Sequence, residues 1–308
     1  MLSFIAKRLL GAIPTLLAIM TIAFFMIRLA PGGPFSSERS VPPEVEANLN
    51  RVYHLDQPLV VQYWHYLKSV LVGDFGPSFS YKDYNVTELI WDGFPVSMQL
   101  GLTAVVLAVL IGSSLGTIAA LRQNRTTDYA VMAAAMTGIT IPNFVMAPLL
   151  TLVLGVYLHV LPAGGWGDGY QLQYKILPII ALALPQIAYV ARLTRGSMIE
   201  VLRSNYIRTA RAKGLSERLT VTRHAARAAL LPVVTYLGPA SAGVITGSVV
   251  IEQIFQIPGI GRYFVQGALN RDYTLVMGVV IFYGVLIIAF NLIVDVLYGV
   301  LDPKLAHR

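Results

Sequence analysis

The sequence predicts an all-α integral membrane protein with six transmembrane helices, and three observations support this prediction. Of the 308 residues, 56% are hydrophobic and 13% are charged, against about 25% charged residues in an ordinary soluble domain. Six apolar stretches approach or exceed the roughly 20 residues that cross a bilayer as a helix. The basic residues gather on one side of these stretches. A soluble core cannot bury this much apolar surface, so the chain belongs to the membrane class.

Each of the six stretches is expected to form one helix. In chain order they are residues 9–29, 95–121, 129–160, 176–191, 230–251 and 274–301. The third contains Pro142 and Pro148, which predict a kink whose freed carbonyl groups are satisfied by neighbouring helices. The fourth is the shortest and contains Pro178 and Pro185. The first exceeds the roughly 7–15 apolar residues of a signal peptide and no small-residue cleavage pattern follows, so we expect a retained helix.

The distribution of Lys and Arg predicts the orientation of the chain. With the N-terminus inside, the inner segments carry fifteen of these residues and the outer segments carry seven. Cytoplasmic loops of membrane proteins are enriched in Lys and Arg. We therefore expect a multi-pass protein with both termini in the cytoplasm.

The largest segment outside the membrane, residues 31–94, is expected on the external side. It opens with the turn signal PGGP, and prolines begin two short predicted helices at residues 43–52 and 58–71. Residues 73–84, GDFGPSFSYKDY, predict an ordered aromatic loop. The predicted parts are an N-terminal transmembrane helix (1–30), this external loop with short helices (31–94), and a five-helix core (95–308) that includes a cytoplasmic segment (197–232).

The predicted cytoplasmic segment carries seven Lys and Arg residues and two Glu residues, and its first half has the periodicity of an amphipathic helix. One face of this helix holds Met198, Ile199, Leu202, Tyr206 and Ala210. The opposite face holds Glu200, Ser204, Arg208 and Arg211. Gly214 is placed to end the helix in the left-handed conformation. Ser216 is placed to cap a second short helix that runs as far as Pro232.

Several chemistries are excluded or disfavoured by the sequence. The absence of cysteine excludes disulfides, thiolate metal sites and thiol nucleophiles. There is no P-loop motif for ATP, and the five scattered histidines contain no H-E-x-x-H, so no metal site is predicted. Residues 112–116, GSSLG, match the nucleophile elbow of hydrolases. Because they lie inside an apolar helix, close helix packing by small residues is the favoured explanation. The net charge of +7 fits the membrane topology, and no nucleic-acid partner is predicted.

Polar residues within the apolar stretches are candidates for transport. Asp295 is the clearest intramembrane charge, although a structural pairing with Arg192 or Arg195 is equally open. Glu252 and Arg28 are expected near the outer interface, within reach of water. A translocation pathway could be lined by residues that could equally hydrogen-bond between helices, namely Thr140, Asn143, Ser241, Thr246 and Ser248.

The cytoplasmic segment resembles the EAA loop of type I ABC-transporter permeases. The matching residues are 208–214, RTARAKG, and Leu231-Pro232 closes the motif. Ala210 and Gly214 fit the family pattern, whereas Arg208 stands where the general pattern has Glu and the interval to Pro232 is longer than usual. Both departures are similar to the peptide-permease branch, whose loop typically has the form YIRTARAKGL.

The resemblance to the peptide-permease branch extends over the whole chain. It is carried by RLAPGGP (28–34), GDFGPS (73–78), IFQIPGIG (254–261), NRDY (270–273) and DVLYGVLDPK (295–304). The loop FGPSFSYKDY is more similar to the oligopeptide permeases than to their dipeptide or nickel relatives. The resemblance therefore implies the permease subunit of an ATP-driven oligopeptide importer in a bacterial inner membrane, without enzymatic activity of its own.

The resemblance also implies partners and roles for particular residues. The partners are a sister permease that forms a heterodimer, two cytoplasmic ATPases that bind ATP and Mg, an external peptide-binding protein, and membrane lipid; this chain itself would bind no cofactor. The ATPase contact would be the coupling helix, with Tyr206, Arg208, Thr209, Ala210, Arg211, Ala212, Lys213 and Gly214. An external gate or loop element is expected at Pro258, Gly259 and Gly261.

Four other functions remain open at this stage. The chain could import dipeptides, nickel or another small ligand of the same branch. It could be a stand-alone secondary transporter or channel, although almost no charge lies at the predicted midplane. A membrane-embedded enzyme would need a catalytic constellation that the tested motifs do not provide. The basic segment could also bind anionic lipid or RNA.

Overall fold

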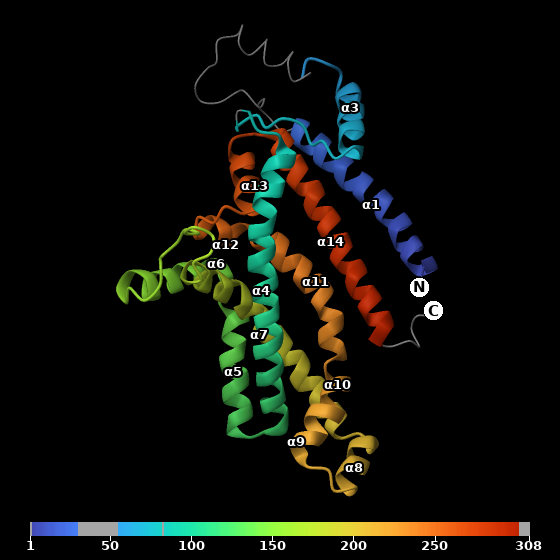
Figure 1. Ribbon diagram of the computed structural model, residues 1–308, viewed down its shortest axis with the longest axis vertical. Coiled ribbons are helices and arrows are strands. Elements are labelled where there is room, and N and C mark those ends of the chain that lie inside the picture. Colours follow the sequence, from blue (N-terminus) through green and yellow to red (C-terminus); the bar gives the residue numbers. More distant parts are fainter. Residues whose placement is uncertain (1, 30–54, 82, 302–308) are drawn as a thin grey trace. The chain divides into compact units, whose positions relative to one another are not determined.

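The computed structural model describes residues 2–29, 55–81 and 83–301, and in these residues the chain is helical apart from loops and one isolated β-bridge between Pro77 and Asn85 (Figure 1). The elements are α1 (Leu2–Leu29), α3 (Leu59–Leu71), α4 (Val86–Leu121), α5 (Thr126–Thr140), α6 (Asn143–Leu150), η1 (Thr151–Tyr157), α7 (Gln173–Leu202), α8 (Asn205–Ala212), α9 (Glu217–Leu219), η2 (Thr220–Ala225), α10 (Ala226–Ala229), α11 (Leu231–Gly247), α12 (Val249–Ile254), α13 (Ile260–Leu269) and α14 (Tyr273–Leu301).

The chain forms two compact units. Of the described residues, those within 98–257 and 289–308 form one unit, and those within 2–97 and 258–288 form the other. These units are defined by which residues pack together. The predicted parts 1–30, 31–94 and 95–308 are instead defined by where the chain is expected to enter and leave the membrane. The predicted parts therefore stay a prediction.

Five helices among the described residues are long and apolar enough to cross a membrane, and a bent pair makes a sixth span if it is counted as one. The five are Arg8–Leu29, Val86–Leu121, Gln173–Leu202, Leu231–Ile254 and Tyr273–Val296. Each of the six predicted stretches corresponds to one of these spans. In lipid every backbone polar group needs an internal partner, which is why long apolar stretches become helices.

The predicted kink in the third span is confirmed, and the change of direction is large. The segments Thr126–Thr140 and Asn143–Tyr157 are bent by 101° at their break. Ile141 is extended, with φ −98° and ψ 117°, as expected for a residue before proline. Pro142 then caps α6, and its carbonyl accepts from the amides of Val145 and Met146 at 2.9 and 3.0 Å.

Two predicted boundaries are wrong. α4 begins at Val86, nine residues before the predicted start at 95, because Asn85 and Glu88 form a reciprocal cap. Asn85 Oδ1 accepts from Thr87 N at 2.8 Å, and Glu88 Oε2 accepts from Asn85 N at 3.2 Å. α7 was expected to be the shortest span but has 30 residues. Its buried face continues to Met198, beyond the point where hydropathy falls.

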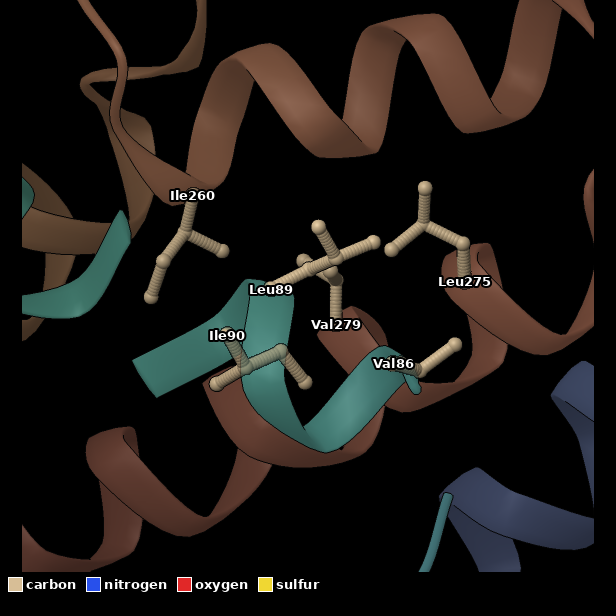
Figure 2. Packing of buried hydrophobic residues seen from close by; sticks show 6 residues of the cluster. All are labelled: Val86, Leu89, Ile90, Ile260, Leu275 and Val279. Carbon is tan, nitrogen blue, oxygen red and sulfur yellow. The ribbon is translucent and has the colours of Figure 1, made fainter. Parts of the chain in front are cut away.

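In the unit formed by residues 2–97 and 258–288, a hydrophobic cluster joins the beginnings of three helices. Val86, Leu89 and Ile90 of α4 pack with Ile260 of α13 and with Leu275 and Val279 of α14 (Figure 2). Gly93 allows this approach, because a Cβ atom there would lie 2.9 Å from Ile260 N. Ile260 N also donates to Ser97 Oγ at 3.0 Å. The start of α13 is thus seated on α4.

In the unit formed by residues 98–257 and 289–308, α7 packs closely against α4 and α5. Cβ atoms at Gly112 and Gly116 would lie 2.8 and 2.5 Å from the carbonyl oxygens of Ile187 and Ala191. The GSSLG segment is therefore a helix-packing surface, as its sequence context favoured. A Cβ atom at Gly138 of α5 would likewise lie 2.3 Å from Leu184 O.

Candidate functional site

The segment between α7 and α11, residues 203–230, is called the α7–α11 connection here. It contains α8, α9, η2 and α10, gathered at the end of α7 (Figure 1). The prediction of one helix running from Met198 past Leu202 is wrong, because α7 ends at Leu202 and a new helix starts at Asn205. The break is at Ser204, whose φ of −67° and ψ of 156° are extended.

This break changes which side of the helix faces inward. Tyr206 was expected on the apolar face but is 48% exposed, whereas Ile207 is completely buried. An extended residue resets the 100° phase between successive helical positions, so a face extrapolated across it is displaced. Ala210, which was expected on the apolar face, is buried.

Ile207 anchors α8 in an apolar socket. The socket is formed by Ala120 at the end of α4, Met198 of α7, Val221 and Ala225 of η2, and Ala229 of α10. Burial of an Ile side chain contributes about 1.5–3 kcal/mol. α8 is therefore attached at once to the ends of two spanning helices and to the segment that leads into a third.

The C-terminus of α8 is closed as the sequence predicts. Gly214 has φ +77°, its amide donates to Arg211 O at 2.9 Å, and Leu215 N donates to Ala210 O at 3.3 Å. These two hydrogen bonds form a Schellman motif, in which the left-handed position favours glycine. The loop then reaches Ser216, whose Oγ accepts from Leu219 N at 3.4 Å and caps α9.

An ion pair spans the loop between α8 and α9. Arg211 donates from Nε and NH2 to the two carboxylate oxygens of Glu217, at 3.0 and 2.6 Å. These hydrogen bonds lower the pKa of Glu217 below its ordinary value of 4.5. Both side chains are substantially exposed, at 42% and 54%, so the pair contributes at most about 1 kcal/mol.

The side of α8 away from the socket is polar and basic. Of the eight predicted contact residues, Ala210 faces inward and seven are exposed, namely Tyr206, Arg208, Thr209, Arg211, Ala212, Lys213 and Gly214. This exposed set, called the outer face of α8, presents cations and hydroxyl groups on a helix whose other side is fixed. Such a geometry suits contact with another protein.

The predicted pathway residues show hydrogen bonds to their own helices. The hydroxyl groups of Thr140, Thr246 and Ser248 donate to Met136 O, Ala242 O and Ile245 O at 3.0, 2.8 and 2.9 Å. Ser241 is buried, and Asn143 is half-buried at the start of α6. Their role in a pathway stays a prediction.

Two of the expectations for charged residues need correction. Glu252 was expected within reach of water, but it is completely buried and accepts a hydrogen bond from Ser248 Oγ at 2.5 Å. Arg195 was a candidate partner of Asp295, but it forms a two-point ion pair with Asp128. Asp295 itself is half-buried on α14. Asp128 is not among the functional residues predicted from the sequence. A local signal was present, because Asp128 lies three residues after Arg125, the N-cap of α5, and acidic residues are typical of the first turn of a helix.

Arg28 was expected within reach of water, and its guanidinium also contacts other side chains of its own unit. Its NH1 donates to Gln62 Oε1 of α3 at 2.6 Å, and its guanidinium lies over the rings of Phe24 and Tyr273 at 5.3 and 5.5 Å from their centroids. The predicted helix at residues 58–71 is confirmed as α3, with Pro58 as its N-cap. The PGGP turn and the predicted helix at 43–52 lie outside the described residues.

The loop at residues 73–84 is organised by Asp272, the acidic residue of the NRDY motif, which the sequence does not mark as a functional residue. Asp272 is completely buried. Its Oδ2 accepts from Ser78 Oγ at 2.5 Å and from the amides of Phe79 and Ser80 at 3.0 Å. Its Oδ1 accepts from Thr274 Oγ1 at 3.0 Å and from Leu275 N at 3.1 Å, which caps α14.

The predicted gate residues lie at the start of α13. Pro258 precedes it, Gly259 is its N-cap with φ −98° and ψ 176°, and Gly261 is buried in its first turn. They form the short element that the sequence predicts after the fifth span. Their role as a gate stays a prediction. Among the residues that the structure describes, no group of three or more His, Asp or Glu side chains could hold a metal ion.

Comparisons with protein families and with solved structures show which membrane proteins this chain is similar to. The model of the family described as "Binding-protein-dependent transport system inner membrane component" matches residues 112–307, and the model of its N-terminal part matches residues 1–101. Among solved structures, the crystal structure of an amino acid ABC transporter with histidines matches with a TM-score of 0.52 and 17% identity. It covers 69% of this chain and 94% of that one. This likeness supports the fold.

Curated relatives are similar over the full length. The oligopeptide transport system permease protein OppB of Escherichia coli (strain K12) is 59% identical over 307 residues, covering 100% of both chains. OppB of Haemophilus influenzae is 55% identical, also over 100% of both chains. The dipeptide permease DppB of Bacillus subtilis is 47% identical, over 99% of this chain and 98% of the relative. Since the two family models together match nearly its whole length, this chain belongs to the family of inner-membrane components of binding-protein-dependent transport systems.

Proposed function

We propose that this chain is the permease subunit of an ATP-driven importer of oligopeptides and forms half of its translocation pathway. The observation that carries the proposal is the 59% identity to an oligopeptide permease over the full length of both chains. The 47% identity to a dipeptide permease is lower, which favours the longer substrate. The proposed partners are a sister permease, two ATPases that bind ATP and Mg, and an external peptide-binding protein.

α8 is the proposed contact with one ATPase. Its outer face is exposed and basic, while Ile207 holds its inner face in the socket. A helix anchored by a buried side chain cannot be displaced without moving the groups around that side chain, because packed interiors transmit strain. Displacement of α8 would therefore be felt at the ends of α4 and α7 and in α10, which leads into α11.

The proposed transport cycle is the one that the resemblance to ABC-transporter permeases implies. The ATPases close when they bind ATP, draw the coupling helices of the two permeases together, and turn the pathway outward. Hydrolysis then resets the inward state. The proposed cycle requires the α7–α11 connection in the cytoplasm, and the excess of Lys and Arg in the inner segments supports a cytoplasmic location for this connection and for both termini.

The external side is assigned to the binding protein and the gate. The loop at 73–84 is held by hydrogen bonds to Asp272, and such a fixed loop suits docking of a binding protein. Pro258, Gly259 and Gly261 are proposed to form part of the external gate. The pathway lining is proposed to include Thr140, Asn143, Ser241, Thr246 and Ser248, with Asp295 as an intramembrane charge.

The proposal is tested by cysteine cross-linking in the assembled transporter, since the chain has no native cysteine. Ala212→Cys lies on the outer face of α8 and is expected to cross-link to an engineered cysteine in the ATPase, with a yield that changes between nucleotide states. Ala210→Cys is the matched control, because the side chain at this position is buried. Absence of an Ala212 cross-link to the ATPase in every nucleotide state would contradict the proposed coupling.

The second candidate, import of dipeptides, is favoured by one observation, the full-length similarity to DppB. The two functions are separated by uptake of labelled alanine peptides of increasing length into proteoliposomes that contain the complete transporter. Oligopeptide transport predicts that longer peptides compete for uptake of a labelled oligopeptide more effectively than dialanine. Preferential competition by dialanine would support the dipeptide function instead.

A further inference from the structure

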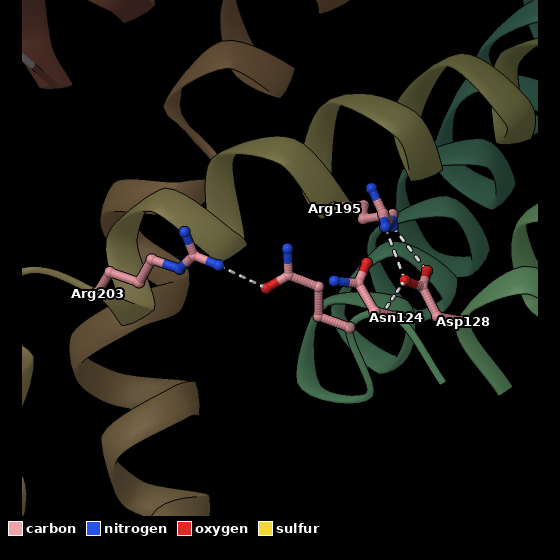
Figure 3. Close-up of polar contacts among 5 residues, drawn as sticks. Asn124, Asp128, Arg195 and Arg203 are labelled. Atoms are coloured by element: carbon pink, nitrogen blue, oxygen red, sulfur yellow. Dashed lines mark hydrogen bonds and ion pairs between the residues drawn. The ribbon is translucent and has the colours of Figure 1, made fainter. Parts of the chain in front are cut away.

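An ion pair between Asp128 of α5 and Arg195 of α7 joins these two helices. Arg195 donates from Nε to Asp128 Oδ1 and from NH2 to Oδ2, both at 2.6 Å (Figure 3). The backbone amide of Asn124 donates to Asp128 Oδ2 at 2.9 Å. Asp128 is 1% exposed and Arg195 is 28% exposed. Two parallel hydrogen bonds between a guanidinium and a carboxylate fix orientation as well as distance.

Asp128 occupies a position that favours its charged form. It lies in the first turn of α5, where the unpaired amide groups of a helix N-terminus stabilise negative charge. Asn124, which supplies the third hydrogen bond, has φ +61°. The turn between α4 and α5 is thus bent around the carboxylate that Arg195 holds.

A second contact holds the far end of α5 on the same helix. Gly138 of α5 approaches Leu184 O of α7 so closely that a Cβ atom would lie 2.3 Å from that oxygen. Asp128 and Gly138 are ten residues apart on α5, about 15 Å, and Arg195 and Leu184 are eleven residues apart on α7, about 16 Å. Two contacts with matching separations on antiparallel helices determine both the position and the direction of α5.

Arg195 also lies beside α4 and close to the socket of α8. A Cβ atom at Gly116 of α4 would lie 3.0 Å from Arg195 N. Met198 follows Arg195 by three residues, about 4.5 Å along the axis, and contributes to the cluster that buries Ile207. Arg195 therefore approaches α4 through its backbone and binds α5 through its side chain. It also lies about one turn from Met198, which helps to bury Ile207 of the proposed coupling helix.

We propose that the Asp128–Arg195 pair is a clamp that makes α5 move together with α7 when α8 is displaced. The clamp rests on the proposed coupling through α8. Without it, α5 is still held to α7 farther along, by the close approach of Gly138 to Leu184 O and by the hydrogen bond from Arg192 NH2 to Met136 Sδ at 2.8 Å. The first turn of α5 can then pivot about that region while α7 moves. α5 leads through the 101° break into α6, so motion carried by the clamp reaches the segment beyond Pro142. Asp128 and Arg195 are accordingly positioning residues for transport and do not contact the substrate.

The test uses the complete transporter with its partner subunits in proteoliposomes, with a labelled oligoalanine peptide as the probe. The measured quantity is the amount of peptide transported per ATP hydrolysed. Asp128→Asn removes the charge at nearly constant shape and is expected to lower this ratio roughly tenfold. Asp128→Glu restores a carboxylate and is expected to recover part of it. A ratio for Asp128→Asn within about twofold of wild type would overturn the clamp.

Arg203→Gln is the matched control. Arg203 lies just beyond the end of α7, and its NH2 donates to Gln123 Oε1 at 3.0 Å (Figure 3). Arg203→Gln therefore also removes a hydrogen bond from an arginine to the α4–α5 turn. Arg203 is exposed, and its bond does not reach α5. Its substitution is expected to leave the ratio within about twofold of wild type, as for other exposed polar pairs. An equal loss in Arg203→Gln and Asp128→Asn would overturn the specific role of the clamp.

A covalent cross-link between positions 128 and 195 tests the mechanical role of the clamp even if Asp128→Asn does not assemble with its partner subunits. In the double variant Asp128→Cys/Arg195→Cys, a short bifunctional methanethiosulfonate replaces the ion pair. The cross-linked transporter is expected to regain the transport ratio and to lose it again on reduction. Failure to regain it, with cross-linking complete, would overturn the clamp. The cross-link of the Ala212→Cys variant, in which Asp128 and Arg195 are intact, reports separately on the proposed coupling, so the two ideas can fail independently.

Discussion

The α7–α11 connection and the loop at residues 73–84 are both held to their own unit, but by different forces. α8 is held by buried apolar side chains, with Ile207 in the socket and Ala210 three positions after it, and polar groups are left on its outer face. The 73–84 loop is held by the buried carboxylate of Asp272, which accepts five hydrogen bonds.

This difference has mechanical consequences. Apolar packing is non-directional, so α8 and the groups packed around Ile207 can shift together while the contact between them is kept. Hydrogen bonds to a carboxylate weaken steeply when their angles change, so the loop must stay fixed or detach. The attachment of α8 therefore suits the transmission of motion, whereas the attachment of the loop suits a fixed shape.

The largest expected effect is at Asp272. Asp272→Ala leaves the amides of Phe79, Ser80 and Leu275 without their acceptor in a buried site, which is expected to reduce the free energy of unfolding by about 3–5 kcal/mol. The loss should appear as a lower midpoint of thermal unfolding in detergent and as faster proteolysis within residues 73–84. Asp83→Asn is the control, since Asp83 is an exposed acid in the same loop. Equal behaviour of the two variants would refute the anchoring role of Asp272.

A smaller effect is expected at Ile207, where the socket can partly close around a shortened side chain. Ile207→Ala should cost about 2–4 kcal/mol and Ile207→Val about 0.5–1.5 kcal/mol. Since the outer face is unchanged, the Ala212 cross-link to the ATPase should persist while transport per ATP falls. Loss of the cross-link together with transport would mean that Ile207 shapes the contact rather than transmitting its motion.

Gly214 tests how the end of α8 is formed. Gly214→Val places a β-branched side chain at φ +77°, which is expected to cost about 1–2 kcal/mol and to open the Schellman motif. Gly214→Asn should cost less, because Asn tolerates the left-handed region. No Cβ clash arises at this position, so the difference between Val and Asn reports backbone strain. Peptide-stimulated ATPase activity is the measurement, and normal activity in the Val variant would contradict the role of Gly214.

Features set by neighbouring residues were predictable from the sequence. The six spans follow from hydropathy, the break at Pro142 from the missing amide, and the Gly214 and Ser216 caps from local conformational preference. The sequence could not predict the inward face of α8, because one extended residue at Ser204 shifts every following position by an unknown angle.

The polar anchors were missed for a related reason. Asp128 meets Arg195 across 67 positions, and Asp272 meets Ser78 across 194. Nothing in the local pattern distinguishes these acids from exposed ones such as Asp83. Glu252 was placed near water because it follows an apolar run, yet packing buries it completely. Long-range pairing decides such cases, and a single sequence does not contain it.

The smallest effect is expected at the Arg211–Glu217 pair. The pKa of Glu217 is lowered in the folded protein by its hydrogen bonds to Arg211, so the stabilisation is complete above about pH 4.5, the ordinary pKa of Glu, and is lost as the pH falls below it. Because both side chains are exposed, Glu217→Gln should cost less than about 1 kcal/mol. Amide hydrogen exchange in residues 213–219 is the appropriate measurement, with faster exchange expected in the variant.

Glu200→Gln, an exposed acid on α7, is the control for the loss of one negative charge. High salt should reduce the difference between wild type and Glu217→Gln, because the pair is reached by solvent. If exchange in residues 213–219 is unchanged in Glu217→Gln at low salt, then the Schellman motif and the Ser216 cap hold this loop without the ion pair. In that case the end of α8, like its inner face, is fixed by short-range packing and backbone geometry, and its charges remain entirely available to a partner.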